Sequence, residues 1–563
     1  QTMKSWAQQT LERMSLEEKA GQVFILSQFS FDENSVERML ERIHKLKLGG
    51  VFQFHVPQRR LSEVIEAYQK FVNIPLLVAA DYEVGTGWTI KDGFRMPRQM
   101  VRGFAGDEQT EQLIGEIIAK QGRAAGVTVT FSPLLDLNSH PDNPDVNIRA
   151  YGEDVEKVAV LASAQIKGLE QNGMLACVKH FPGNGGTGMD QHIMAPILPF
   201  SKEEMENTYL EVYRRVFEQT NVGCVMVAHL EVPAYTTEIN PRNGRLVPSS
   251  ASSEIVTDLL RGKLGYKGLI ITDALDMGGI TSHYTHEERV VKCLQAGCDC
   301  LLVFQESCEN EVNAVLEAVR SGSLSMERLD DAVLHVLQAK ERLGLHHTRG
   351  LPAPDEVRRD LFRNENYADF RDLILQKGIT LYRNMGDVLP IGDIRGKRVL
   401  VLNTFNPDSM TWQANKDFTL PVDITPRLLK DRGALVEEIE IRDYMPNSAL
   451  YEILDKIAKV DYTFYNFFIW PIWGVGTLIP NKCALRLFYY GMLVIDKPII
   501  ITSFGSPYVM QYCPNAPVYL CTFEETEAAQ RAAVKAWFGE AKTTGRSPVN
   551  LKDVFSIGDG IEI

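Results

Sequence analysis

The stretch LACVKHFPGNGGTGMDQH, residues 175–192, joins a short apolar run to a glycine-rich loop. The run 175–181 follows an amphipathic stretch at 153–171 and has the length of a buried strand. Residues 179–192 contain four glycines and a proline, a composition that excludes a helix. A helix, a buried strand ending in polar residues and then a flexible loop are typical of one repeating unit of a parallel α/β protein.

The same alternation extends outward in both directions from this stretch. The apolar runs are 21–28, 49–55, 75–81, 127–137, 175–181, 223–230, 268–275 and 300–305. The amphipathic stretches are 34–46, 60–71, 107–124, 153–171, 202–218, 252–263, 286–296 and 310–320. Eight such units predict an α/β fold that begins with a (β/α)8 barrel of the TIM type.

A second alternating region follows the predicted barrel. Strand-like runs occur at 398–403, 436–441, 461–468, 498–503 and 517–521, with helix-like stretches that include 447–459 and 525–538. This pattern predicts a doubly wound α/β sandwich. We therefore expect a catalytic barrel over residues 1–345, a linker over 346–372 and a C-terminal domain over 373–563.

The composition narrows the classes of function. With 45% apolar and 23% charged residues, the 563-residue chain has the balance of an ordinary globular protein. Its formal charge of −14 argues against a nucleic-acid partner, because such proteins concentrate basic residues on one face. We find no apolar segment long enough to span a membrane, and nothing that determines the oligomeric state.

The cysteines and glycines give no sign of a cofactor. The nine cysteines are odd in number and most lie inside apolar runs, so we expect reduced core residues. Cys298 and Cys300 have no second Cys or His pair at a zinc-like spacing, and we predict no metal. The second region lacks a complete dinucleotide fingerprint, and we predict no cofactor. Reduced cysteines favour the cytoplasm, but a chain that begins at Gln1 leaves a secreted or periplasmic protein without its leader open.

Polar residues end five of the predicted barrel strands. They are Asp81, Asp136, Lys179 with His180, His229 and Asp273. One such residue alone is more often a strand-end cap than a functional group. Equivalent positions on five strands meet at the carboxyl-terminal mouth of a barrel, where barrel enzymes have their active sites. We therefore expect a functional site at this mouth.

The loop after the fifth predicted strand ends in Asp190 and His192. The alternative interpretation is a mobile surface loop with incidental charges, which its place at the barrel mouth disfavours. An aspartate two residues before a histidine can accept the imidazole N–H, which favours the charged ring and raises its pKa. This spacing makes His192 a candidate general acid.

Here the sequence resembles glycoside hydrolase family 3, in particular its β-N-acetylglucosaminidase branch, whose loop has the form KH[FI]PGHGxxxxD[ST]H. The resemblance extends over most of the chain. It includes LERMSLEEKAGQVF (11–24), NPDVNIRAYGED (143–154), LLRGKLGYKGLIITDALDMGGI (259–280), ITSFGSPYVM (501–510) and TTGRSPVNL (543–551). Most members of the family use a glutamate of the second domain as acid/base, whereas this branch uses the His and Asp of the loop.

The resemblance implies a retaining hydrolase that releases terminal β-linked N-acetylglucosamine. Asp273 would attack the anomeric carbon, and His192, assisted by Asp190, would protonate the leaving oxygen. The residues that would hold the sugar hydroxyls are Asp81, Arg149, Lys179 and His180. Carboxylates and cationic donors suit that task, because they form charge-assisted hydrogen bonds with hydroxyl groups. Asp276 is a rival nucleophile, but it would lie past the strand end.

Three positions depart from the pattern of the branch. Asn184 stands where a histidine is usual, and Gln191 stands where Ser or Thr separates the Asp from the His. Thr89 occupies a position that often holds a sugar-contacting arginine, which Arg95 or Arg98 would have to replace. The aglycone or outer sugar is therefore expected to differ from that of the usual members.

Three other functions remain as alternatives. One is a β-glucosidase or β-xylosidase of the same family, in which Glu524 or Glu525 is the acid and the loop pair is incidental. Another is a phosphorylase, because a mostly neutral histidine repels incoming phosphate less than a carboxylate does. The last is a sugar-binding protein without turnover, which would have no need of Asp273.

Overall fold

In the computed structural model the described residues are 4–405, 422–474 and 476–563. The chain divides into two compact units. The first comprises Gln1–Met96, Asp107–Leu137 and Val155–Asn364, and the second comprises Pro97–Gly106, Asn138–Asp154 and Glu365–Ile563. Two segments from within the predicted barrel region therefore belong to the second unit, which the sequence pattern did not indicate. The linker bounds 346–372 stay a prediction.

The first unit is a (β/α)8 barrel, which confirms the predicted fold. Its eight strands follow the order β10-β1-β2-β3-β4-β5-β6-β9, and every pairing is parallel. A bridge between Ile271 and Cys300 joins the two ends of the sheet. The strands are β1 (Phe24–Gln28), β2 (Gly50–Gln53), β3 (Leu77–Ala80), β4 (Val129–Thr130), β5 (Leu175–Phe181), β6 (Cys224–Val227), β9 (Leu269–Thr272) and β10 (Leu301–Val303).

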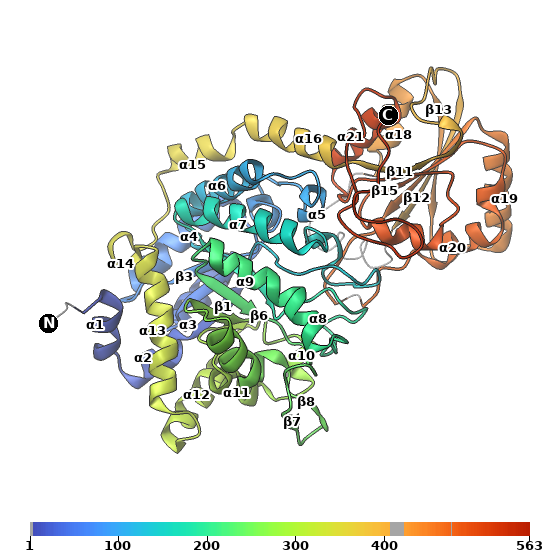
Figure 1. Ribbon diagram of the computed structural model, residues 1–563. Coiled ribbons are helices and arrows are strands. Elements are labelled where there is room, and N and C mark those ends of the chain that lie inside the picture. The colour runs from blue at the N-terminus through green and yellow to red at the C-terminus, as the bar shows by residue number, and fades with distance from the viewer. Residues whose placement is uncertain (1–3, 406–421, 475) are drawn as a thin grey trace. The chain divides into compact units, whose positions relative to one another are not determined.

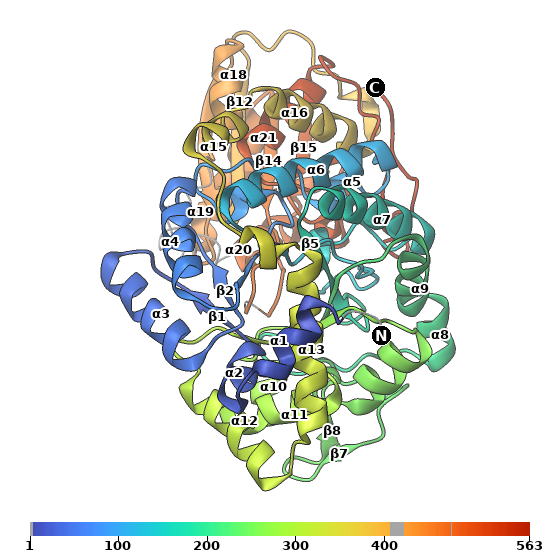
Figure 2. The same ribbon diagram turned by 90° about the vertical axis from the view of Figure 1, so that its left-hand side faces the viewer.

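Helices surround these strands, as both views show (Figures 1 and 2). They are α3 (Glu33–Leu46), α4 (Gln58–Phe71), α6 (Glu108–Ala125), α7 (Val155–Gln171), α8 (Lys202–Asn207), α9 (Tyr209–Gln219), α11 (His286–Ala296) and α12 (Glu309–Ser321). The stretch predicted as one helix at 202–218 is two, because Thr208 leaves helical geometry (φ −125°, ψ −94°). Residues Glu254–Lys263 form a π-helix where an α-helix was expected.

The interior of the barrel is filled by alternate residues of the strands. They include Ile25, Phe52, Leu77, Val129, Leu175, Cys177, Met226, Ile271, Cys300 and Leu302, all buried. All nine cysteines lie among the described residues, and each is buried and free, as predicted. This interior is a packed core, so chemistry is left to the residues at the strand ends.

The second unit contains a six-stranded sheet in the order β11-β16-β15-β14-β12-β13. The strands are β11 (Thr380–Asn384), β12 (Arg398–Phe405), β13 (Leu435–Ile441), β14 (Tyr462–Phe468), β15 (Ile499–Ser503) and β16 (Val518–Cys521). Its helices include α16 (Asn366–Gly378), α18 (Ile424–Asp431), α19 (Asn447–Lys459), α20 (Lys482–Tyr489) and α21 (Glu527–Trp537). The sheet confirms the predicted α/β domain, with one addition. The edge strand β11 runs antiparallel to β16 and was not predicted, because its sequence TLYRN alternates weakly.

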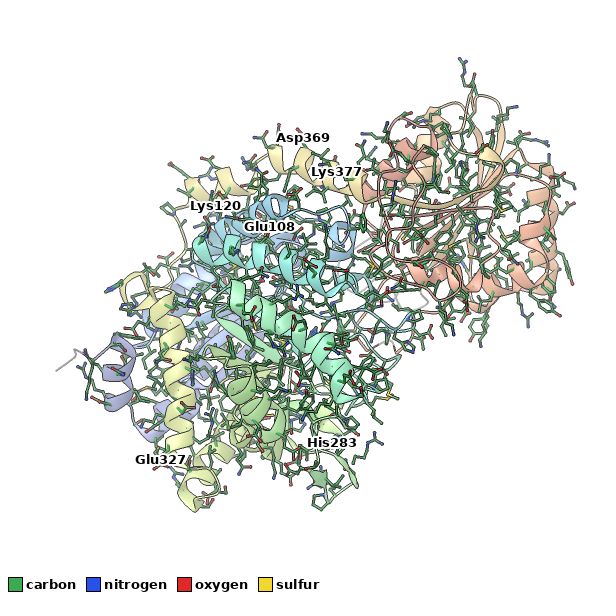
Figure 3. All side chains as sticks on the ribbon, viewed as in Figure 1. Glu108, Lys120, His283, Glu327, Asp369 and Lys377 are labelled. Carbon is green, nitrogen blue, oxygen red and sulfur yellow. The ribbon has the colours of Figure 1, made fainter. Side chains whose placement is uncertain are left out.

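The outer helix faces carry the charge. Glu108 and Lys120 on α6 and Glu327 on α13 (Met326–Arg342) are exposed, and Figure 3 labels them. Within the described part of the chain, none of the helices combines the length and the hydropathy needed to cross a membrane.

Candidate active site

Asp273 is the first residue after β9, and its carboxylate is held on both oxygens. The backbone N–H of Ala274 donates to Oδ1 (2.7 Å), and Gln191 Nε2 donates to Oδ2 (3.1 Å). His180 Nε2 lies 3.8 Å from Oδ2. The side chain keeps 13% of its surface exposed. The carboxylate is thus oriented and still reachable from solvent, as a nucleophile has to be.

Asp276, the rival nucleophile, is occupied by structural contacts. It accepts hydrogen bonds from Arg289 Nη2 (3.2 Å), Gln305 Nε2 (2.7 Å) and the backbone N–H of Phe304. Arg289 is fully buried, so Asp276 compensates a buried charge. This role makes Asp276 a poor candidate for covalent catalysis.

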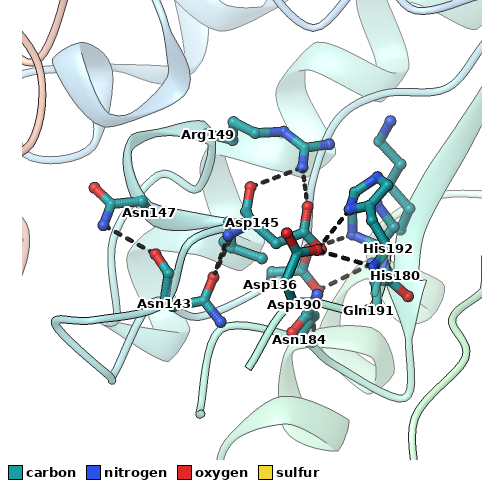
Figure 4. Close-up of polar contacts among 12 residues, drawn as sticks. Asp136, Asn143, Asp145, Asn147, Arg149, His180, Asn184, Asp190, Gln191 and His192 are labelled. Carbon is teal, nitrogen blue, oxygen red and sulfur yellow. Dashed lines mark hydrogen bonds and ion pairs between the residues drawn. The ribbon is translucent and has the colours of Figure 1, made fainter. Parts of the chain in front are cut away.

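The glycine-rich loop places His192 against Asp190, as the spacing predicts. Asp190 Oδ1 accepts both from the His192 backbone N–H (2.9 Å) and at His192 Nδ1 (2.8 Å) (Figure 4). The Asp190 side chain is buried, whereas 20% of the His192 side chain is exposed. With Nδ1 fixed on a buried carboxylate, Nε2 is the nitrogen through which the ring would exchange a proton.

The end of β5 contributes a second group of charged contacts. Lys179 Nζ lies 3.0 Å from Asp81 Oδ1 and 2.7 Å from Glu83 Oε1. His180 Nδ1 lies 2.6 Å from Asp136 Oδ2. Lys179 is buried, while the Asp81 side chain keeps 30% of its surface exposed. The buried lysine therefore holds a carboxylate that faces solvent.

Asp136 fixes the backbone at the start of the loop through hydrogen bonds. Its Oδ1 accepts from the backbone N–H groups of His180 (3.0 Å) and Asn184 (2.8 Å), as Figure 4 shows. The Asn184 side chain in turn accepts from the N–H of Gly185 (2.8 Å). Asp136 is fully buried, so its part is to orient His180 and the loop backbone.

Arg149 lies in the segment Asn138–Asp154 of the second unit. It ends the short 3₁₀ turn Asn147–Arg149 and pairs with Asp145 of the same unit (Nη1–Oδ1 2.9 Å). It also donates to the backbone oxygen of Asp145 (2.9 Å). Its expected contact with a sugar hydroxyl stays a prediction.

The family model described as the glycosyl hydrolase family 3 N-terminal domain matches residues 15–339. The chain belongs to glycosyl hydrolase family 3. The family 3 enzyme is therefore a glycosidase. Active sites of barrel enzymes lie at the carboxyl-terminal mouth of the barrel, where the residues described above are found.

One relative matches nearly the whole enzyme, and another matches about half of it. It is 26% identical to a protein of Cellulomonas fimi named beta-N-acetylglucosaminidase/beta-glucosidase, over 97% of this chain and 95% of that protein. A beta-hexosaminidase of Chromobacterium violaceum is 34% identical over 48% of this chain and 75% of its own.

Two solved structures are also similar. The beta-glucoside phosphorylase BglX matches with a TM-score of 0.86 and 26% identity, covering 98% of this chain and 97% of its own. A family 3 beta-N-acetylglucosaminidase from Paenibacillus sp. matches with a TM-score of 0.81 and 26% identity, covering 96% of this chain and all of its own (100%).

The glutamates of the β-glucosidase alternative are engaged within the second unit. Both oxygens of Glu525 accept from Arg98, from Nε at 2.9 Å and from Nη2 at 2.7 Å. Glu524 accepts from the Arg98 backbone N–H (2.7 Å), and both carboxylates are buried. The two-point pair with arginine stabilises Glu525 as the anion, which disfavours a proton-donating role for that residue.

Thr89 stands where related sequences often have a sugar-contacting arginine, and the contacts of Thr89, Arg95 and Arg98 do not identify a replacement for it. Thr89 Oγ1 is buried and accepts from Gln53 Nε2 (2.6 Å). Arg95 lies over the Trp88 ring at 5.3 Å from its centre, and Arg98 is paired with Glu525. The suggestion that either arginine contacts sugar stays a prediction.

Sequence reasoning missed one residue of this region, Glu83, and assigned no specific role to another, His229. Glu83 is the second carboxylate on Lys179, and its position two residues after Asp81 was the available signal. His229 was noted at a strand end without a function. It is buried against the segment that follows β9, with Nε2 3.0 Å from Ala274 O and Nδ1 2.7 Å from Ser250 Oγ. Burial lowers the pKa of His229, so a neutral ring donates to Ala274 O and accepts from Ser250.

One group inside the barrel unit brings possible metal ligands together. Ligand atoms of Asp299, Asp331 and His335 lie within 4.8 Å of one another. Asp299 already accepts from Arg261 and from Arg328 (2.8 Å). A cation there would meet two guanidinium groups, so we assign no metal to this group.

Proposed function

We propose that the enzyme is a retaining glycosidase that releases terminal β-linked N-acetylglucosamine. In this proposal Asp273 is the nucleophile, and His192 with Asp190 transfers the proton. The observation that carries it is the contact of His192 Nδ1 with the buried Asp190 (2.8 Å), on a loop that also contacts Asp273 through Gln191 (3.1 Å). The names of the Cellulomonas fimi and Paenibacillus proteins are consistent with the substrate.

The proposed reaction has two displacements. First, an oxygen of Asp273 bonds to the anomeric carbon as the glycosidic bond breaks, and the leaving oxygen takes the proton of His192 Nε2. Then His192 accepts a proton from water, the water oxygen bonds to the anomeric carbon, and Asp273 leaves as the carboxylate. Two inversions at one carbon retain its configuration.

The direct test compares 4-nitrophenyl β-N-acetylglucosaminide with the matching β-glucoside and β-xyloside. We expect the highest kcat/KM for the N-acetylglucosaminide, and nuclear magnetic resonance should detect the β-anomer as the first product. A first product of α configuration would contradict the retaining mechanism. A preference for the glucoside would favour the β-glucosidase alternative, which the double name of the Cellulomonas fimi protein also suggests.

A phosphorylase is the second candidate, because the enzyme resembles a β-glucoside phosphorylase over 98% of its chain. A histidine that becomes neutral after giving up its proton repels phosphate less than a carboxylate would. The same assays with and without phosphate separate the candidates. A glycosidase releases the free sugar at a rate that phosphate leaves unchanged. With a phosphorylase, added phosphate increases the reaction rate, and the product is a glycosyl phosphate.

The proposed sugar-binding residues lead to one prediction. Lys179→Ala should lower kcat/KM by about 10- to 100-fold, because it removes the group that holds Asp81 and a charged donor for the sugar. It should also lower the free energy of unfolding, since Asp81 and Glu83 lose the cation between them.

Steady-state kinetics and urea unfolding measure the two effects. Asp81→Ala should lower kcat/KM to a similar degree with a smaller change in stability, because that side chain is partly exposed. Lys167→Ala, which alters an exposed lysine of α7, is the matched control. Unchanged kcat/KM in both Lys179→Ala and Asp81→Ala would show that these residues do not bind the sugar.

A further inference from the structure

The acid loop and the nucleophile segment are joined at Gln191, a fully buried residue. Gln191 Nε2 donates to Asp273 Oδ2 (3.1 Å), and Gln191 Oε1 accepts from the backbone N–H of His229 (3.2 Å). The side chain therefore bridges the ends of two barrel strands, β6 and β9. It reaches the carboxylate that the proposed function makes the nucleophile.

The surrounding hydrogen bonds determine which end of the amide faces Asp273. A backbone N–H can only donate, so the group that faces His229 N must be the carbonyl oxygen of the glutamine. The amide nitrogen then has to face Asp273. The contact is consequently a hydrogen bond from a neutral donor to a carboxylate. Its direction follows from the contact with His229 N, which fixes the positions of the amide oxygen and nitrogen of Gln191.

The backbone around Gln191 is docked as tightly as its side chain. The N–H of Gly279 donates to Gln191 O (2.9 Å), and the N–H of Gly278 donates to His192 O (2.8 Å). A Cβ on Gly278 would lie 2.1 Å from Ile193 O, and one on Gly279 would lie 2.7 Å from His229 Cβ. The two glycines therefore permit an approach that any larger residue would prevent. Gln191 is held in position by main-chain contacts as well as by its own amide.

We propose that Gln191 is a catalytic residue that stabilises the Asp273 carboxylate as it leaves the sugar. The inference rests on the proposed function, in which Asp273 forms and then breaks a bond to the anomeric carbon. In the second displacement a water oxygen bonds to that carbon, a water proton passes to His192, and the electron pair of the breaking bond returns to Asp273. A donor at Oδ2 binds the returning negative charge more strongly than it binds the neutral ester.

The glutamine is a feature of this chain rather than of the loop pattern it resembles. Ser or Thr at this position carries its hydroxyl on Cβ, so its donor lies closer to the backbone than the amide of Gln191. The longer side chain is what spans from the acid loop to Asp273 Oδ2. The second displacement in this enzyme therefore has a donor that the pattern itself does not supply.

The test compares the rates of the two displacements in the variant Gln191→Ala. With a dinitrophenyl glycoside, whose leaving group needs no proton, the first displacement is fast. We expect kcat to fall by about 10- to 100-fold, the effect of losing a hydrogen bond to a charged group. KM should fall with it, and a rapid burst of dinitrophenol should precede the steady state. Mass spectrometry of the quenched reaction should detect the accumulated glycosyl-enzyme.

Two further variants separate an effect on catalysis from an effect of Gln191→Ala on folding. Gln191→Glu preserves the size of the side chain but places a second carboxylate beside Asp273, so its activity should rise towards low pH, where the introduced carboxyl regains a proton to donate. The charged and titratable groups nearby are Asp273 itself, His180, whose Nε2 lies 3.8 Å from Asp273 Oδ2, the buried His229, whose backbone N–H donates to Gln191, and the loop neighbours Asp190 and His192. Gln305→Ala is the matched control, because Gln305 also donates its amide to an aspartate, Asp276 (2.7 Å). It should show no burst and little change in kcat.

The outcomes separate this inference from the proposed function. A wild-type enzyme that is labelled at Asp273 by a fluoro-sugar, together with a Gln191→Ala variant of unchanged kcat and KM, would overturn the inference alone. A fall in kcat at constant KM and without a burst would also overturn it, because it would mean only a misplaced nucleophile. Absence of label at Asp273 in the wild type would overturn the proposed function and the inference with it.

Discussion

Replacement of Asp273 by asparagine is expected to lower turnover by roughly 10⁴-fold or more, the scale of losing a covalent nucleophile. An amide cannot form the glycosyl ester. The change should leave the fold intact, because asparagine has nearly the same shape and can still accept the N–H of Ala274 on one atom. The measurement is kcat/KM with an aryl β-N-acetylglucosaminide, beside circular dichroism and thermal unfolding.

A trapping experiment assigns the nucleophile directly. A fluoro-sugar glycoside with a good leaving group should label the peptide 268–280, and fragmentation should place the label on Asp273. Asp276→Asn is the control, since it should retain the label at Asp273 while losing stability through its contact with the buried Arg289. Label on Asp276 in the wild type would refute the assignment of the nucleophile.

His192→Ala is expected to cause the second-largest loss, and the loss should depend on the leaving group. A general acid contributes roughly 10²–10⁴-fold when the departing oxygen needs a proton. Hydrolysis of a phenyl glycoside or a disaccharide should therefore slow by about that factor. The first displacement with a dinitrophenyl glycoside should remain much closer to the wild-type rate, because that leaving group departs unaided.

Asp190→Ala tests the other half of the pair. The Asp190 carboxylate contacts His192 Nδ1 (2.8 Å), so its removal takes away the partner that orients the ring and stabilises its charged form. The reaction needs the protonated acid, and activity on poor leaving groups should therefore be lost at a lower pH than in the wild type. Asp190 also holds the His192 backbone, so the variant should lose activity through orientation too. Equal losses on good and poor leaving groups in both variants would favour the alternative with Glu524 or Glu525 as the acid.

The barrel was predictable because its strands are buried on both faces. Strands of that kind form short continuous apolar runs, and each predicted run contains one strand of the barrel sheet. The polar residues at the strand ends were predictable for the same reason, since a charged side chain interrupts such a run. The edge strand β11 escaped because it is only partly buried and is defined by its antiparallel pairing with β16.

The segments at 97–106 and 138–154 escaped for a different reason. Their sequences carry loop signals, which specify flexibility but no partner. Their place in the second unit depends on contacts that exist only in the folded protein. Arg98 binds Glu525, Asn138 binds Tyr508 (2.9 Å) and the N–H of Asn550 donates to Glu153. Each contact joins residues hundreds of positions apart.

The sequence by itself determined the alternation of strands and helices, the place of Asp273 at a strand end and the pairing of Asp190 with His192. These are local properties, set by side-chain periodicity and by two residues of one tight loop. Only the tertiary structure decided which distant side chains meet, as in Lys179 with Asp81, 98 residues apart, and Gln191 with Asp273, 82 residues apart. The physical reason is that such contacts depend on closure of the barrel and on the direction of each side chain at its mouth, and no periodicity along the chain encodes either of them.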